Sequence, residues 1–181
     1  LKSPSRLAKD QGYTVTSTTI RPSADQLKAA GTNYTEWIVP RYIQLPNGLP
    51  DRVRYLAQRL TLSYTDSYSK ATAIEGFLRG FTFTHNMAAP PTGTDGIDYF
   101  IFTARSGYSD YYASAMVVLL RTANIPARLV VGYSGGDYDI NTNLYTVRET
   151  HTHAWPEAYF PGYGWVAFEP TATKPLIPRG T

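Results

Sequence analysis

Two histidines and a few hydroxyl and carboxylate side chains are the groups in this sequence best suited to acid–base or nucleophilic chemistry. His151 and His153 stand two residues apart in a stretch that is typical of a β-strand, so we expect both on one face of that strand. An HxH pair can chelate zinc, but the third ligand would have to be His85, Glu149 or another carboxylate, at no recognisable spacing. The plainer interpretation of each histidine is a partly buried side chain held by hydrogen bonds.

Ser109 and Glu169 each allow a structural and a chemical interpretation. Ser109 follows Gly107-Tyr108 and opens a predicted helix, where a serine oxygen is one of the best N-caps and contributes about 1 kcal/mol. The chemical interpretation is a nucleophile whose anion is stabilised by the positive end of the helix dipole. Glu169 ends a predicted strand, either as a solvated carboxylate before a turn or as the group that orients an imidazole.

A long buried helix and the strand after it must position these groups. Between Ser109 and Ala123 apolar residues recur at helical spacing, and Val117 and Val118 widen the apolar stripe. This pattern predicts a helix that is buried on nearly all sides. An Asn-x-Pro sequence ends the helix, and residues 127–133 are predicted as a strand closed by a Ser-Gly-Gly turn.

Strands dominate the C-terminal part of the chain. The sequence predicts them over residues 144–147, 152–160 and 165–168. The turn Pro161-Gly162-Tyr163-Gly164 between the last two is a hairpin signal. Helices followed by an antiparallel sheet indicate an α+β fold in one domain.

The N-terminal part is predicted as an arm followed by helices. Residues 1–48 are polar and irregular, and we interpret them as an arm packed on the domain. The arm holds a Thr-rich, strand-like stretch from Tyr13 to Ile20 and a short helix from Ser23 to Ala30. After it the sequence predicts a helix over 51–60, a helix over 67–78 and a Pro/Gly-rich surface loop over 85–96.

The composition excludes several classes of protein. With 181 residues, 43% hydrophobic and 17% charged, the chain fits one domain that removes roughly 70% of its unfolded surface from water. Cysteine is absent, which excludes disulfides, Cys-ligated zinc, iron–sulfur clusters and a thiol nucleophile. The net charge of +3 arises from scattered basic residues, so no nucleic-acid face is implied.

The longest apolar run, Ala115 to Leu120, is far shorter than the ~20 residues of a membrane helix. Because the chain starts at Leu1 rather than Met, we expect it to be part of a longer protein.

Four sequence motifs stand in order along the second half of the chain. They are RSGYSDYYASA from Arg105, LRTANIPAR from Leu120 with Val131-Gly132-Tyr133, HAWPEAYF from His153, and GWVAFEPT from Gly164. Together they resemble the core of the bacterial transglutaminase-like superfamily, and look closest to the extracytoplasmic domain of membrane-anchored transglutaminases of the TgpA type. One such motif is weak, but four in order are highly specific.

The resemblance implies a papain-like α+β fold in which a buried helix carrying the nucleophile position packs on an antiparallel β-sheet. On this basis we expect an N-terminal arm over residues 1–48, a transglutaminase-like core over 49–175 and a C-terminal tail over 176–181.

The resemblance also implies a catalytic triad. The family's Cys, His and acidic positions fall on Ser109, His153 and Glu169. In such a triad the nucleophile attacks a carboxamide carbon and forms an acyl-enzyme. His153 would protonate the leaving ammonia or amine and then activate an amine or water, while Glu169 holds the ring tautomer. The backbone N–H of Ser109 is the expected oxyanion donor, and the second donor is not identified.

Ser109 departs from the family's cysteine. A hydroxyl is not ionised at this position and must lose its proton to His153 during attack, so we expect at most weak activity. Two explanations stay open: an engineered Cys to Ser substitution, which we favour, and a natural non-catalytic relative that binds peptides. A His-ligated metal hydrolase is a further rival.

The remaining expectations concern the surroundings of the site. Tyr108 and Trp155 are candidates for the wall of a cleft that receives an extended peptide, although such aromatic residues more often pack in the core. Arg128 is expected to pin its strand rather than to bind substrate. The resemblance implies no cofactor and no metal, a protein or peptide substrate with an amine or water as acceptor, no nucleic acid, a monomer, and an extracytoplasmic location in a membrane-anchored parent. It leaves transferase and protease activity both open.

Overall fold

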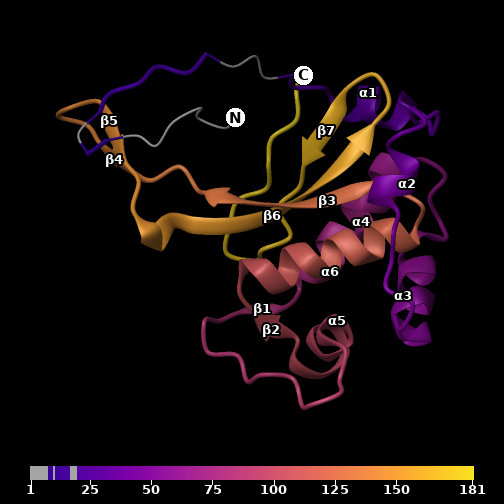
Figure 1. Ribbon diagram of the computed structural model, residues 1–181. Helices are drawn as coiled ribbons and strands as arrows, with labels where there is room; N and C mark the ends of the chain where they lie inside the picture. Colours follow the sequence, from indigo (N-terminus) through magenta and orange to yellow (C-terminus); the bar gives the residue numbers. More distant parts are fainter. Residues whose placement is uncertain (1–7, 10, 17–19) are drawn as a thin grey trace.

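The computed structural model describes residues 8–9, 11–16 and 20–181, and shows helix α6 lying along one face of an antiparallel sheet (Figure 1). The helices are α1 (Ala24–Ala29), α2 (Val39–Tyr42), α3 (Asp51–Thr61), α4 (Ser67–Arg79), α5 (Gly96–Asp98) and α6 (Ser109–Thr122), with a π-helical turn at Tyr99–Ala104 and a 3-10 turn at Glu149–His151. The strands are β1 (Thr82–Phe83), β2 (Ser106–Gly107), β3 (Ala127–Tyr133), β4 (Asp137–Asp139), β5 (Leu144–Thr146), β6 (Thr152–Phe160) and β7 (Gly164–Ala167). The expected α+β class is confirmed.

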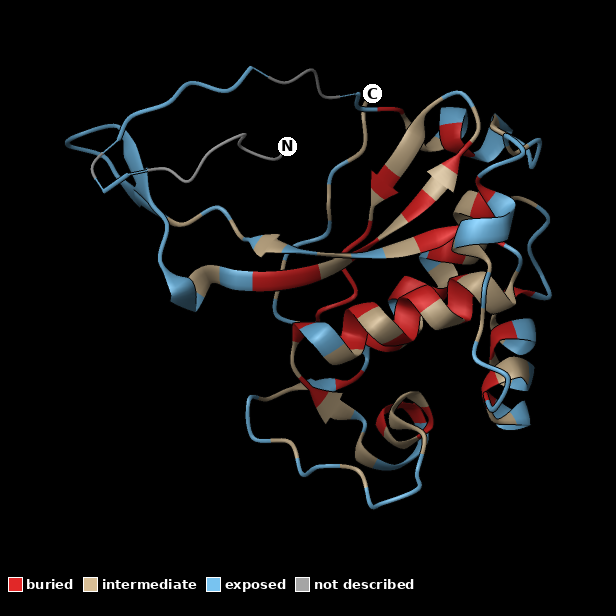
Figure 2. Ribbon diagram, viewed as in Figure 1, coloured by how far each residue is buried: buried red, intermediate tan, exposed pale blue. Residues whose placement is uncertain are grey.

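Helix α6 is the centre of the core, as its all-round apolar pattern predicts. It contacts α3 and α4 as well as β3 and β6, and Figure 2 shows it red along most of its length. Its buried residues are Ser109, Tyr112, Ala113, Ala115, Met116, Val117, Leu119 and Leu120. Full burial of each large apolar side chain stabilises the fold by about 1.5–3 kcal/mol. The helix therefore anchors the site residue at its first position to the best-packed part of the molecule.

The sheet has the strand order β3-β6-β7, and both pairings are antiparallel. The predicted strands 127–133 and 152–160 are confirmed at both ends. The hairpin between β6 and β7 is also confirmed, since the two strands pair antiparallel with Phe160 opposite Gly164. In the turn, Gly162 and Gly164 have φ of 82° and 79°, in the left-handed region that favours glycine. Strand β7 begins and ends one residue earlier than expected, so Phe168 and Glu169 lie beyond it.

A second hairpin, β4–β5, extends away from the body of the molecule (Figure 1). Strand β5 ends at Thr146, one residue before the end of the expected 144–147 strand, and β4 was not predicted from the sequence. All residues of both strands are exposed. A strand that buries neither face has no alternation of apolar and polar residues, which is the signal that predicts strands.

The N-terminal part differs from the expectation at its start. The strand-like stretch Tyr13 to Ile20 forms no strand at residues 13–16 or 20, and its residues 17–19 lie outside the described part of the chain. The short helix is confirmed as α1, with Ser23 as its N-cap in a capping box with Gln26. Leu27 of this helix is buried in the core next to α4. The helices α3 and α4 each extend one residue beyond their predicted ends, and the predicted loop 85–96 ends one residue early because Gly96 begins α5.

The segment that leads into α6 has a compact geometry that the sequence analysis did not predict. The π-helical turn ends at Arg105, whose N–H donates to the carbonyl of Phe100 and whose φ is 46°. The chain then enters β2, which pairs in parallel with β1. A Cβ on Gly107 would lie 3.1 Å from Met87 Sδ and 3.3 Å from both Phe100 and Tyr111, so only glycine fits without displacement. This close packing fixes the direction in which α6 begins.

No helix within the described residues is long and apolar enough to cross a membrane.

Replacing Tyr112 with Phe tests the packing of α6. The hydroxyl of Tyr112 is buried and has no hydrogen-bond partner among the described residues. An unsatisfied buried hydroxyl costs about 1–3 kcal/mol, so we expect Tyr112→Phe to raise the free energy of unfolding by about 1 kcal/mol. Tyr34→Phe is the matched control, because Tyr34 Oη lies 3.4 Å from Ser67 Oγ and its removal should lower stability. Urea denaturation measures both; a Tyr112→Phe protein less stable than the parent contradicts the expectation.

Candidate functional site

Ser109 is the first residue of α6 and is buried at 8% exposure. The N-cap of the helix is Tyr108, in extended conformation, so the capping interpretation of Ser109 is wrong. Its Oγ instead accepts a hydrogen bond from the N–H of Ala154 at 3.3 Å and donates to Asp110 Oδ1 at 3.4 Å. A side chain at this position lies at the positive end of a 14-residue helix.

His153 lies on β6, opposite Gly132 of β3. It is buried at 7% exposure, and its ring stacks on that of Trp155 at 6.3 Å between centroids. A Cβ on Gly132 would come within 3.0 Å of the Trp155 ring, so glycine leaves room for the indole beside the imidazole. This packing restricts the orientations open to the His153 side chain.

Glu169 meets His153 although 16 residues separate them in the sequence. Its Oε2 lies 2.6 Å from His153 Nε2, and its Oε1 accepts the N–H of Thr171 at 3.0 Å. Burial acts to raise the pKa of Glu169, but the hydrogen bonds from His153 and Thr171 outweigh it and hold the pKa below its ordinary value. Glu169 contacts only Nε2 of the imidazole, so Nδ1 is available to a different group.

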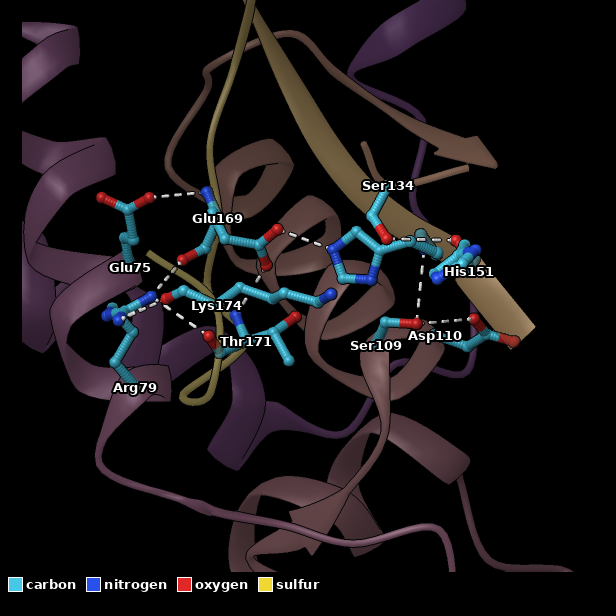
Figure 3. A network of polar contacts seen from close by, with 11 residues as sticks. Glu75, Arg79, Ser109, Asp110, Ser134, His151, Glu169, Thr171 and Lys174 are labelled. Carbon is cyan, nitrogen blue, oxygen red and sulfur yellow. Dashed lines mark hydrogen bonds and ion pairs between the residues drawn. The ribbon is translucent and has the colours of Figure 1, made fainter. Parts of the chain in front are cut away.

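The structure brings the three predicted residues together around the start of α6. In Figure 3 a dashed line joins the Glu169 carboxylate to the His153 imidazole, and the Ser109 side chain stands at the start of α6. The link from Ser109 runs to the backbone of Ala154, next to His153. Within the described part of the chain there is no hydrogen bond between Ser109 Oγ and the His153 ring.

Two details of the sequence interpretation are wrong. Glu169 does not end a strand but lies two residues beyond β7, in an irregular segment. His151 is not on the strand with His153, because it belongs to the 3-10 turn before β6. Its Nδ1 accepts the N–H of Arg148, and its Nε2 lies 3.5 Å from Asp137. His151 and His153 thus each have their own carboxylate. The residues described contain no group of three or more His, Asp or Glu placed to hold a metal ion.

The other predicted residues lie around this centre. Tyr108 lines a hollow of about 270 Å³ with Asp110 and Tyr111, on the side of α6. Trp155 is half-buried against His153. A cleft of about 400 Å³ beside the His153–Glu169 pair is lined further by Ser134, Asp137, His151 and Lys174.

Arg128 pins its strand, as expected. It pairs with Glu157 of β6 at 2.6 Å, and its guanidinium lies 4.3 Å from the centroid of the Trp165 ring. The side chain therefore ties β3, β6 and the start of β7 together.

Glu75 and Arg79, which were not predicted from the sequence as site residues, contact the backbone around Glu169. Glu75 Oε1 accepts the N–H of Glu169 at 2.7 Å, and Arg79 donates to the carbonyl of Glu169 at 2.7 Å (Figure 3). Burial raises the pKa of Glu75, partly offset by the Glu169 N–H and by the charges of Arg179 and Arg79. A signal was present, because Glu75 stands four residues after Ala71 and three before Leu78, within the apolar stripe of its helix.

Comparison with known proteins places this geometry in a family. The profile of the Transglutaminase-like superfamily matches residues 54–170. The uncharacterized protein YebA of Bacillus subtilis is 46% identical over 138 residues, a match that covers 72% of this chain and 19% of YebA. A protein-glutamine gamma-glutamyltransferase of Pseudomonas aeruginosa is 37% identical over 137 residues, covering 76% of this chain and 20% of that protein.

Solved structures agree. The crystal structure of the periplasmic domain of TgpA from Pseudomonas aeruginosa matches with a TM-score of 0.68 at 35% identity, over 77% of this chain and 48% of that chain. A structure from Cytophaga hutchinsonii, described as a candidate cysteine protease, matches with a TM-score of 0.60 at 22% identity, over 86% of this chain and 51% of that chain, and supports the fold alone. The chain thus spans about a fifth of the curated relatives and about half of the solved ones. The expected papain-like fold is confirmed, and the chain belongs to the transglutaminase-like superfamily.

Proposed function

We propose that residues 109, 153 and 169 form the acyl-transfer site of a transglutaminase-type enzyme, acting on glutamine or peptide amides without a cofactor. The observation that carries the proposal is the buried contact of His153 Nε2 with Glu169 at 2.6 Å, made beside the start of α6 where Ser109 stands. Membership of the family and likeness to a relative named a protein-glutamine gamma-glutamyltransferase support this reaction class.

The proposed reaction uses a thiol at position 109. The helix start and an adjacent imidazolium lower a thiol pKa from ~8.5 to ~3.5–7.5, so the thiolate attacks the carboxamide carbon. His153 gives its proton to the leaving ammonia, and an acyl-enzyme forms. His153 then removes a proton from an amine or water, which attacks the acyl carbon and releases the thiolate. Glu169 keeps Nε2 protonated and Nδ1 turned toward the reacting atoms.

Backbone groups at the site suit an anion. The Ser109 N–H is unpaired within its helix, as at every helix start, and is the proposed oxyanion donor. The N–H of Ala154 points at the side-chain oxygen of residue 109. With a sulfur in that place, the same N–H would donate to the thiolate.

In this proposal, the serine at position 109 leaves the chain weakly active or inactive. Its Oγ is engaged by Ala154 and Asp110, and a hydroxyl needs a general base in the act of attack. We favour an engineered Cys to Ser substitution. The alternative is a natural non-catalytic module that keeps the cleft and binds peptides.

The same relatives support an extracytoplasmic location. The matched TgpA structure is that of a periplasmic domain. We therefore propose that this chain is an extracytoplasmic domain of a membrane-anchored parent, working as a monomer on protein or peptide substrates and not on nucleic acid, with Tyr108 and Trp155 as cleft walls.

Restoring the thiol tests the proposal. We expect Ser109→Cys to incorporate an amine into a glutamine-containing peptide or to hydrolyse its amide, with a covalent acyl adduct at residue 109 in mass spectrometry. His153→Ala in the Ser109→Cys background should lower kcat by about 10²–10⁴-fold. A Ser109→Cys protein whose thiol reacts with iodoacetamide but which forms no acyl adduct favours the peptide-binding alternative.

The ionised state of Glu169 gives a stability test that needs no activity. Because its folded pKa is lowered, its contribution is present above the unfolded carboxyl pKa of ~4.3 and is lost as pH falls through the folded value. We expect Glu169→Gln to lower the free energy of unfolding at pH 7 by about 1–3 kcal/mol and the difference from the parent to shrink below about pH 4. Urea denaturation at pH 7, 5 and 3.5 measures it. A constant difference at all three values would remove the charged role of Glu169.

A further inference from the structure

The position of Glu169 is not determined by the sheet. Strand β7 ends at Ala167, and the last hydrogen bond in line with it runs from the N–H of Phe168 to the carbonyl of Pro156 at 3.0 Å. Glu169 is the next residue, in a segment without regular structure. Something outside the sheet must therefore hold its backbone if its carboxylate is to meet His153 in one orientation.

Two side chains of α4 hold this backbone. Glu75 is buried at 6% exposure, and its Oε1 accepts the N–H of Glu169 at 2.7 Å. Arg79 uses one nitrogen for the carbonyls of Glu169 at 2.7 Å and Thr171 at 3.1 Å, and the other for Lys174 at 2.8 Å. Both backbone polar groups of Glu169 are thus bound by side chains from another element, as Figure 3 shows.

The spacing along α4 makes this arrangement possible. Residues four apart in a helix lie one above the other on the same face, so Glu75 and Arg79 reach the same segment. In the part of the chain that the structure describes, the two do not form an ion pair with each other. Their hydrogen-bonding capacity goes to the backbone of residues 169–174 instead.

A role in packing alone does not account for these residues. Burial disfavours the charged form of Glu75, and the Glu169 carboxylate adds like charge, while Arg79 and Arg179 offset it. An apolar side chain in the stripe between Ala71 and Leu78 would avoid that cost. What the carboxylate provides is an acceptor aimed at one backbone N–H, next to the acid of the proposed site.

We propose that Glu75 and Arg79 are positioning residues, which clamp the backbone at residues 169–174 so that the Glu169 carboxylate is held against His153 Nε2. This inference rests on the proposed function. The clamp acts through Glu169 on the orientation of the imidazole, and neither residue lines the cleft beside the His153–Glu169 pair. A shift of the imidazole by about 1 Å can cost on the order of 10²-fold in rate.

The kinetic test uses the Ser109→Cys protein. Arg79→Lys keeps the charge and the aliphatic stem but has no planar fork for three carbonyls, and Glu75→Met removes the acceptor at similar size. We expect each to lower kcat by about tenfold to a hundredfold with KM changed by less than about twofold. Glu75→Gln keeps an oxygen acceptor and should recover most of the kcat that Glu75→Met loses. Glu36→Met, at an exposed glutamate, is the matched control.

A spectroscopic test separates the clamp from the reaction and uses the Ser109 chain itself. The imidazole proton shared between His153 and Glu169 should give a downfield N–H resonance, easily assigned because the sequence has three histidines. We expect Arg79→Lys and Glu75→Met to shift or broaden it, and Glu75→Gln and Glu36→Met to leave it in place.

The outcomes are distinct. A shifted or broadened resonance with reduced kcat supports the clamp. An unchanged resonance in folded Arg79→Lys protein overturns it, whatever happens to kcat. If Ser109→Cys proves inactive, the proposed function fails, but the resonance still decides whether the clamp positions Glu169.

Discussion

The hydrogen bond between His153 and Glu169 lies where water is largely excluded, and neighbouring groups of the fold offset the free-energy cost of burying it. Both side chains are less than a tenth exposed. Removing a carboxylate from water costs several kcal/mol unless hydrogen bonds replace the lost hydration. Here Glu169 receives one bond from the imidazole and one from the Thr171 backbone, and its pKa falls rather than rises. One edge of the ring, the Nε2 side, is thereby committed to Glu169.

Each partner of this bond comes from an element whose position is fixed elsewhere. His153 belongs to the central strand of the sheet, which packs on α6, and the Trp155 ring flanks its imidazole. Glu169 lies past the end of the last strand and depends on side chains of α4. The site thus joins three parts of the fold, the sheet, the central helix and the α4 helix, and its geometry depends on how the core packs.

At the start of α6, the residue present differs from the one that the proposed chemistry needs. The helix start and the N–H of Ala154 both favour an anion on residue 109. A serine hydroxyl is a hydrogen-bonding group of ordinary acidity in the same place, and it bonds to neighbours rather than to the imidazole. Serine and cysteine are close in size, so the packing at the start of α6 would accept either, whereas the proposed reaction depends on the difference between sulfur and oxygen.

Much of the architecture follows from local patterns in the sequence. Several elements can be predicted from one segment of sequence at a time, through its periodicity or its turn residues. They are helix α6, the strands 127–133 and 152–160, and the turn at Gly162. Strand β4 and the π-helical turn before Arg105 lack such a signal, since exposed or irregular backbone has no period. The identities of the three candidate residues also came from the sequence, through ordered motifs. Their contacts did not.

Only the tertiary structure decided that Glu169 stands beyond its strand, that His151 turns to Asp137, and that Ser109 bonds to Ala154 instead of capping its helix. It alone identified the partners of Glu75 and Arg79, because the residues near them in the sequence do not indicate a contact with residues 169–174. The physical reason is the separation of the interacting residues along the chain. Helical and strand patterns reflect interactions over a few residues. In contrast, the Glu169 carboxylate is stabilised by a group 16 positions away and the Glu75 carboxylate by one 94 positions away, and only the packed core brings these within hydrogen-bonding distance.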